Sequence, residues 1–117
     1  IFSGPCNGLV KNFENALRHC KNDYIFLSDQ DDIWLESKVS CVLNAFKGTN
    51  ADVILHDCIV VNKNADVLAD SFFKLRHCRR GFLFNILHNS YIGCCMALKR
   101  SFLTNVLPFP QNIPMHD

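Results

Sequence analysis

Apolar residues follow two patterns in the first half of this chain, and each pattern predicts a different element. Apolar positions three and four residues apart over 9–20 predict an amphipathic helix, and the same spacing over 39–46, with Gly48 as a C-terminal cap, predicts another. The run 24–27 between them is continuous, apolar and rich in β-forming residues, which is typical of a buried strand. The first half therefore alternates helix, strand and helix.

The second half contains shorter apolar segments. In chain order they predict one or two strands, a helix, a strand and a short helix that two prolines end: 52–55 and 59–61, 82–87, 91–98, and 99–107. The composition of 62–66 suits a turn, so a hairpin is expected there. Strands that alternate with helices predict an α/β domain with a mixed, mainly parallel sheet flanked by helices, to which the hairpin adds an antiparallel element.

Length and composition exclude several classes of protein. A chain of 117 residues fits a single domain, and 49% apolar with 20% charged residues excludes a disordered chain. A net charge of +1 is too small to attract nucleic acid as a partner. The longest nearly apolar run, 91–98, is too short to cross a bilayer. Because the chain starts without methionine and stops without a polar tail, we expect a piece of a longer protein.

Seven cysteines are spread along the chain, mostly among apolar neighbours. An odd number at irregular spacing favours reduced, buried thiols over a disulfide framework, and we expect a cytoplasmic protein. The adjacent pair Cys94 and Cys95 is the nearest approach to a zinc-binding spacing, and without a C-x-x-C or H-x-x-x-H pair the sequence does not favour zinc.

Three carboxylates, Asp29, Asp31 and Asp32, follow directly on the strand 24–27. Like charges this close repel one another unless a cation or hydrogen-bond donors hold them. Mg²⁺ or Mn²⁺ prefers oxygen ligands and takes one or two carboxylates together with water and substrate phosphates, which a D-x-D at a strand end can offer. An aspartate here could instead cap the following helix. The strand before the acids and the aromatic residue after them favour the metal site.

The segment 24–34 resembles the D-x-D segment of family-2 glycosyltransferases, most closely the rhamnosyltransferase-like branch. The helix 9–20 is similar to the family's preceding helix, 91–95 resembles its acceptor-side strand, and 115–117 resembles the start of its H-D segment. The family's nucleotide-binding first strands would lie before residue 1, and further helices would follow the last residue. The resemblance therefore implies one incomplete domain, 1–117, from the centre of a GT-A catalytic domain.

This resemblance implies transfer of a sugar from a nucleotide-diphosphate donor, UDP- or dTDP-linked, to a hydroxyl acceptor with inversion. The acceptor would be a saccharide or lipid-linked saccharide in surface polysaccharide synthesis. By the resemblance Asp31 ligates the divalent ion, Asp29 shares the metal or contacts the donor's ribose, and Asp32 orients the donor-binding loop. Asp117 would be the general base that takes the acceptor's proton. The fragment by itself is expected to be inactive, and peripheral membrane association of the full-length protein at the inner face stays open.

Three further residues are weaker candidates. Asp57 is either a hydrogen-bonded buried acid or a site residue, and the structural role is favoured because buried acids need partners in any case. Trp34 either stacks on a sugar or plugs the core under the acidic loop, and its apolar neighbours favour the plug. Gly93 lies in the expected acceptor-side strand.

Two rival interpretations use the same acids. In a haloacid-dehalogenase-like phosphohydrolase the first Asp of a D-x-D is the nucleophile, but that motif prefers Thr or Val where Asp32 stands. An EF-hand loop is excluded, because Trp34 occupies the glycine position and Ser40 the glutamate position. A fragment that binds substrate without turning it over remains the non-enzymatic alternative.

Overall fold

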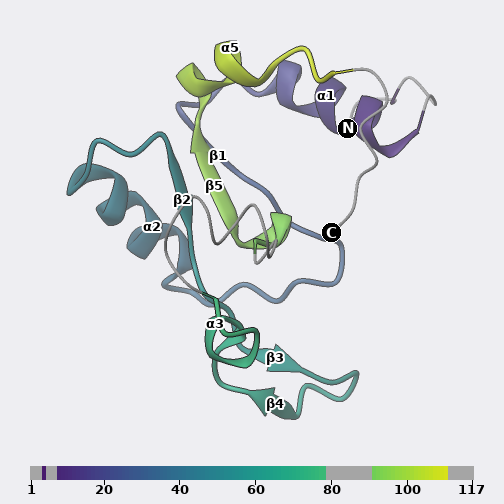
Figure 1. Ribbon diagram of the computed structural model, residues 1–117, viewed down its shortest axis with the longest axis vertical. Helices are drawn as coiled ribbons and strands as arrows, with labels where there is room; N and C mark the ends of the chain where they lie inside the picture. The colour runs from purple at the N-terminus through teal and green to yellow at the C-terminus, as the bar shows by residue number, and fades with distance from the viewer. Residues whose placement is uncertain (1–3, 5–7, 79–90, 111–117) are drawn as a thin grey trace.

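The computed structural model describes residues 4, 8–78 and 91–110 of the chain. Their elements, in chain order, are α1 (Leu9–His19), β1 (Tyr24–Phe26), α2 (Lys38–Lys47), β2 (Val53–Leu55), β3 (Val60–Val61), β4 (Val67–Ala69), α3 (Phe72–Leu75), η1 (Gly93–Cys95), β5 (Met96–Lys99), η2 (Arg100–Phe102) and α5 (Leu103–Val106) (Figure 1). Among these described residues no helix is long and apolar enough to span a bilayer.

The two helices expected in the first half are confirmed. The N-cap of α1 is Gly8, whose φ of 91° is a left-handed conformation that glycine adopts without strain. Glu14 lies buried on α1 between Lys11 and Arg18, at 2.9 and 2.7 Å. Hydrogen bonds from Arg18 and Lys11 hold the pKa of Glu14 below its ordinary value. Gly48 caps α2 as expected.

The main sheet has the strand order β1-β5-β2, and β5 is antiparallel to both neighbours. Ile25 pairs with Leu98, and Ile54 pairs with Ala97. The expectation of a mainly parallel sheet is wrong for the described strands. A helix between two strands does make β1 and β2 point the same way, but they are not neighbours. The later strand β5 fills the place between them and makes every described pairing antiparallel.

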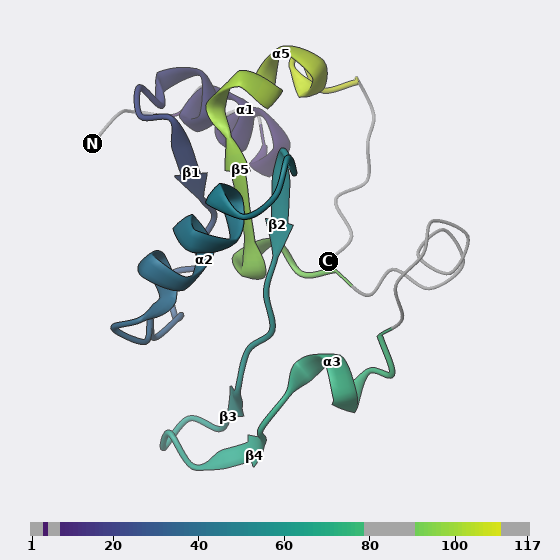
Figure 2. The same ribbon diagram turned by 90° about the vertical axis from the view of Figure 1, so that its left-hand side faces the viewer.

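The expected hairpin is confirmed as a separate two-stranded sheet of β3 and β4. Its turn is closed by Asn62, whose side-chain oxygen accepts from the backbone N–H groups of Asn64 and Asp66 at 2.8 and 3.0 Å. The hairpin and α3 lie to one side of the main sheet in both ribbon views (Figures 1 and 2).

The elements after residue 90 agree in part with the expected ones. The strand expected over 91–98 begins only at Met96, because 93–95 form a 3-10 turn that leads into it. The short helix expected over 99–107 is confirmed as η2 followed by α5. The helix expected over 82–87 lies outside the described residues.

The core forms on both faces of the main sheet, since successive side chains of a strand point to opposite faces. On one face Leu17, Ile25, Leu98 and Leu103 pack together, which attaches α1 and α5. On the other face Val42, Phe46 and Ala97 pack together and attach α2. Figure 2 shows α2 in front of the sheet, with α1 and α5 above it. The layers of helix, sheet and helix confirm the α/β class.

Candidate functional site

The acidic turn, residues 28–32, follows directly on β1. Leu27 still donates to the Met96 carbonyl at 3.0 Å, so the sheet holds the chain up to the start of the turn. The Asp32 N–H donates to the Asp29 carbonyl at 3.4 Å. The Asp32 carboxylate in turn accepts from the Asp29 N–H at 3.0 Å and from the Ser28 hydroxyl at 3.5 Å. Asp32 therefore acts within the turn and fixes its shape.

Asp29 and Asp31 behave differently from Asp32. Both side chains are exposed, and neither makes a hydrogen bond or ion pair with another described residue. Two unengaged carboxylates two residues apart are suitable ligands for a hard divalent cation. Among the described residues no three His, Cys, Asp or Glu side chains gather into a complete metal cage. Two carboxylates fit Mg²⁺ nonetheless, because it usually retains water and substrate oxygens in its remaining positions.

A network of side chains supports the acidic turn from below. The indole Nε1–H of Trp34 donates to the Ser28 hydroxyl oxygen at 3.1 Å. Lys38 places its ammonium 4.1 Å from the centroid of the Trp34 ring, and the Phe26 ring lies 5.7 Å away on a tilted plane. Trp34 is 39% exposed, so the expectation that it plugs the core is wrong. It supports the turn from the rim of a cavity.

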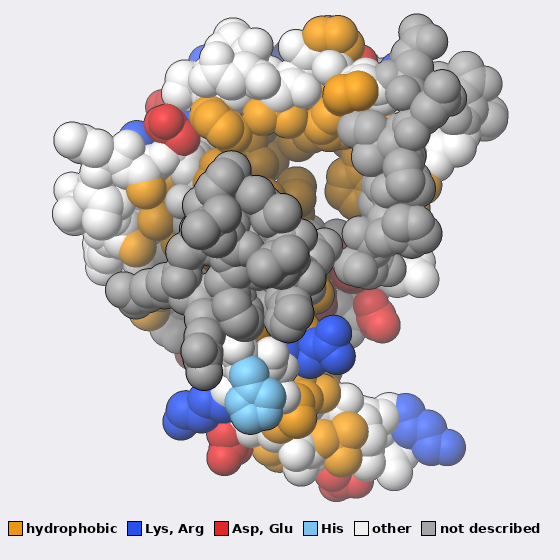
Figure 3. Space-filling view, viewed as in Figure 1, with side chains coloured by type: hydrophobic (Ala, Val, Ile, Leu, Met, Phe, Trp, Pro, Cys, Tyr) orange, Lys and Arg blue, Asp and Glu red, His pale blue; other side chains and the backbone are white. Residues whose placement is uncertain are grey.

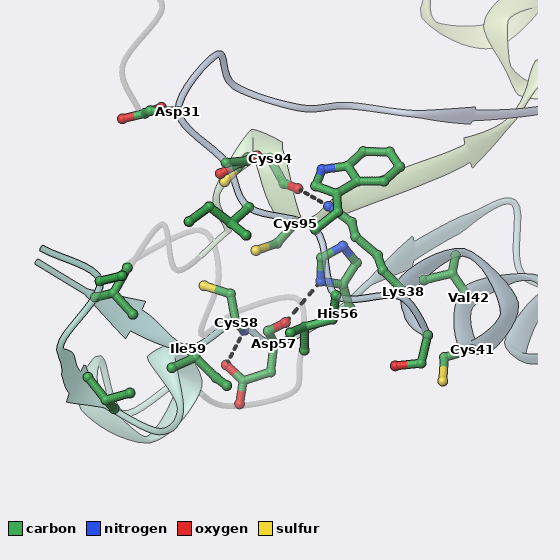
Figure 4. Close-up of a pocket in the computed structure, with 18 residues that line it drawn as sticks. Asp31, Lys38, Cys41, Val42, His56, Asp57, Cys58, Ile59, Cys94 and Cys95 are labelled. Carbon is green, nitrogen blue, oxygen red and sulfur yellow. Dashed lines mark hydrogen bonds between the residues drawn. The ribbon is translucent and has the colours of Figure 1, made fainter. Parts of the chain in front are cut away.

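This first cavity has a volume of about 530 Å³ (Figure 4). Its walls come from the acidic turn, the start of α2, the segment after β2, the hairpin and the chain before β5. Most of the exposed wall is apolar. The charged or polar side chains besides the thiols are those of Asp31, Asp32, Trp34, Ser37, Lys38, His56 and Asp57.

His56 was not singled out by the sequence. Its backbone N–H donates to Cys95 at 3.0 Å, which extends the β2–β5 pairing by one residue. Its Nδ1 lies 2.9 Å from the Asp57 carbonyl, and since a carbonyl only accepts, Nδ1 carries the proton. Nε2 is buried and has no hydrogen-bond partner in the part of the chain that the structure describes. In the neutral ring Nε2 therefore keeps its lone pair.

Asp57 is held by three donors. The Ser71 hydroxyl lies 2.5 Å from its carboxylate, and the backbone N–H groups of Cys58 and Phe73 both lie at 2.9 Å. Burial raises the pKa of Asp57, but these hydrogen bonds, with that from Phe72, outweigh it and lower the pKa below the ordinary value. Asp57 is exposed rather than buried, so only the hydrogen-bonded part of the expected structural role is found: its carboxylate joins the segment after β2 to the start of α3.

Four thiols line the same cavity, those of Cys41, Cys58, Cys94 and Cys95. Cys58, Cys94 and Cys95 are neighbours there. Burial raises the pKa of Cys95, and burial together with the charge of Asp32 raises the pKa of Cys94. All six described cysteines are free thiols, as expected, but only Cys95 is buried, and Cys41 is exposed.

A second cavity, of about 720 Å³, lies between α1 and the acidic turn. Asp29 and Asp31 both line it, and Gly93 lies at its wall, where a Cβ would meet no atom within 4 Å. Asp31 borders both cavities, so the acidic turn separates them. Asp117, the expected general base, lies outside the described residues.

Lys38 and His56 are two polar cavity residues that the sequence analysis did not single out. The sequence offered one weak signal for each: Lys38 stands four residues after Trp34, and His56 directly precedes Asp57. Nothing in the sequence indicates that the two share a cavity, because 17 residues separate 38 from 56 without a common motif.

A layered α/β domain with unengaged carboxylates in a turn at a strand end, between two cavities, places these acids where α/β sheets commonly bind ligands. The chain belongs to the glycosyl transferase family 2, whose family model matches residues 1–107. Members of this family are glycosyltransferases that bind nucleotide-sugar donors and acceptors. Comparisons with the curated proteins and with the solved structures give no match.

Proposed function

We propose that this protein transfers a sugar from a UDP- or dTDP-linked donor to a hydroxyl acceptor with inversion at the anomeric carbon. The observation that carries the proposal is the contrast within the acidic turn. Asp32 holds the turn, whereas the carboxylates of Asp29 and Asp31 have no partner in the described chain, and both residues border the cavity of about 720 Å³. We assign this cavity to the donor and the cavity of about 530 Å³ to the acceptor.

Asp31 and Asp29 would hold a divalent cation, Mg²⁺ or Mn²⁺. The cation supplies positive charge against which the diphosphate leaving group develops its negative charge. The chain's own residues prepare this position. Asp32, Ser28 and Trp34 fix the turn before the donor arrives, so less order has to be gained on binding.

Inversion needs one displacement, in which the acceptor hydroxyl loses its proton to a base as it attacks. We propose Asp117 as that base, on the resemblance of 115–117 to the family's H-D segment. The rhamnosyltransferase-like specificity, a saccharide or lipid-linked saccharide acceptor, and a role in surface polysaccharide synthesis at the inner face of the membrane belong to the same proposal. They rest on the resemblance of the segment 24–34.

Calorimetric titration with UDP and dTDP, with and without Mn²⁺, tests the proposal. We expect nucleotide binding that depends on Mn²⁺ and weakens at least about tenfold in Asp31→Asn, because one metal ligand loses its charge. Asp70→Asn is the matched control, since Asp70 is exposed and lies in neither cavity. Binding of beryllofluoride with Mg²⁺, without any nucleotide binding, would contradict the proposal and indicate a phosphohydrolase.

A further inference from the structure

Lys38 is a half-buried cation that forms no ion pair within the described residues. It is the first residue of α2, where the helix dipole disfavours positive charge. Its ammonium donates to the Cys94 carbonyl at 3.3 Å and lies over the Trp34 ring at 4.1 Å. Neither a carbonyl nor an aromatic ring neutralises a charge, so the site holds a cation that still lacks an anion.

The ammonium still has hydrogen-bonding capacity. It has three N–H groups, and one described acceptor, the Cys94 carbonyl, uses only one of them. Figure 4 shows the Lys38 side chain directed into the first cavity, with the His56 ring at the same cavity. The unpaired Nε2 of His56 is a second polar atom there without a partner in the described structure. Besides the exposed Asp31 carboxylate, the cavity thus contains an ammonium without a described counter-ion and a ring nitrogen without a described partner.

The acids of this cavity do not neutralise Lys38. Asp57 is occupied by Ser71, Cys58 and Phe73, and Asp32 by the turn itself. Asp31 is the unengaged acid at the cavity, and it also faces the second cavity, where we place the metal. Most of the remaining wall is aliphatic, which suits the less polar face of a ligand.

We propose that Lys38 binds an oxyanion group of the acceptor, a carboxylate or a phosphate, in the cavity of about 530 Å³. The inference rests on the proposed function in assigning this cavity to the acceptor. Lys38 is then a specificity-determining residue. Acceptors with an oxyanion group gain affinity from Lys38, whereas neutral sugars do not. The other cavity, with Asp29 and Asp31, keeps the donor diphosphate apart from this charge.

The single tryptophan of the chain provides a reporter for this site. The Lys38 ammonium lies over the Trp34 ring. An anion that draws the ammonium away therefore changes the chemical shift of the indole Nε1–H in an NMR spectrum. The probes are glucuronate for a carboxylate, glucose 1-phosphate for a phosphate, and glucose as the neutral match. We expect a saturable shift with at least one anion and none with glucose. The anion that binds identifies the source of the oxyanion.

Substitutions of Lys38 separate the effect of its charge on anion binding from the effect of its shape. Lys38→Met keeps the apolar stem and should weaken anion binding at least about tenfold, whereas Lys38→Arg should retain it. Lys47→Met removes an exposed lysine from the other end of α2 and serves as the control. The inference is overturned if glucose gives the same shift, if neither anion gives a saturable one, or if Lys38→Met binds the anions as the wild type does.

Titration with UDP and Mn²⁺ distinguishes this inference from the proposed function. Failure of the wild type to bind UDP would contradict the donor site but leave the anion result standing. If Lys38→Met instead loses UDP and keeps anion binding, Lys38 belongs to the donor site and the inference is wrong. If a Lys38 variant does not fold, the comparison of anion binding with glucose binding in the wild type still tests the inference.

Discussion

The Ser71 hydroxyl donates a hydrogen bond to the Asp57 carboxylate across 14 residues of sequence. Ser71 is also the N-cap of α3, where its oxygen accepts from the Lys74 N–H at 3.0 Å. The two residues therefore close the base of the hairpin, which forms one wall of the first cavity. In the space-filling view hydrophobic side chains gather in the middle of the lower lobe, with charged side chains at its edges (Figure 3). Val67 and Leu68 of the hairpin are exposed.

Ser71→Ala should destabilise the protein. The change removes a hydrogen bond to a charged group, which contributes roughly 1.5–3 kcal/mol, and a helix cap, which contributes about 1 kcal/mol. Because the two contributions share one hydroxyl, we expect a loss of roughly 2–3 kcal/mol in the free energy of unfolding, measured by urea denaturation. Ser101→Ala, at an exposed serine of η2, is the control and should change it little. Equal midpoints for both variants would show that the Ser71 contact contributes nothing.

Asp57 should make the protein sensitive to acid. Its folded-state pKa lies below the ordinary value, so its contribution to stability is complete above the unfolded pKa of about 4 and is lost as the pH falls through the folded pKa. The difference in unfolding free energy between wild type and Asp57→Asn should therefore be largest near neutral pH and shrink below about pH 4. Denaturation at a series of pH values measures it. A difference independent of pH would show that the Asp57 charge is not stabilised by folding.

Trp34→Phe should weaken metal-dependent nucleotide binding without unfolding the protein. Phenylalanine keeps a ring for Lys38 but lacks the Nε1–H that donates to Ser28, so the acidic turn loses one support. One hydrogen bond of about 1 kcal/mol corresponds to roughly a fivefold weaker affinity for UDP with Mn²⁺, measured by calorimetry. Tyr24→Phe, which deletes a polar group from an exposed aromatic residue outside both cavities, is the control. Unchanged affinity in Trp34→Phe would mean that the indole does not shape the turn.

The cysteines should differ widely in their reaction with iodoacetamide. Cys41 is exposed on α2, whereas Cys95 is only 4% exposed, and burial raises its pKa. At pH 8 we expect Cys41 to be alkylated well before Cys95, which should react only when the protein unfolds. Peptide mass spectrometry over time measures both rates in one sample. Alkylation of Cys95 as fast as Cys41 would mean that the β5 end of the cavity opens readily.

Local patterns predicted the elements well. The helices α1 and α2 follow from apolar spacing because a helix repeats within four residues, and the hairpin turn follows from the composition around Asn62. The sheet order did not follow. The short strand β5 pairs with β1 and β2 from far along the chain, and nothing within β5 specifies that it lies between them. A parallel sheet was expected because the connection through α2 fixes strand direction but not strand neighbours.

By itself, the sequence determined that three carboxylates follow a buried strand and that the chain is an α/β domain. Only the tertiary structure decided which carboxylates are engaged: Asp32 by its own turn, Asp57 by Ser71, and Asp29 and Asp31 by nothing in the described chain. It also brought Lys38 to the Cys94 carbonyl, 56 residues away. The physical reason is the distance along the chain over which each kind of interaction acts. Propensity and periodicity act over a few neighbouring residues, whereas burial, hydrogen bonding and charge pairing depend on groups that meet only when distant segments pack.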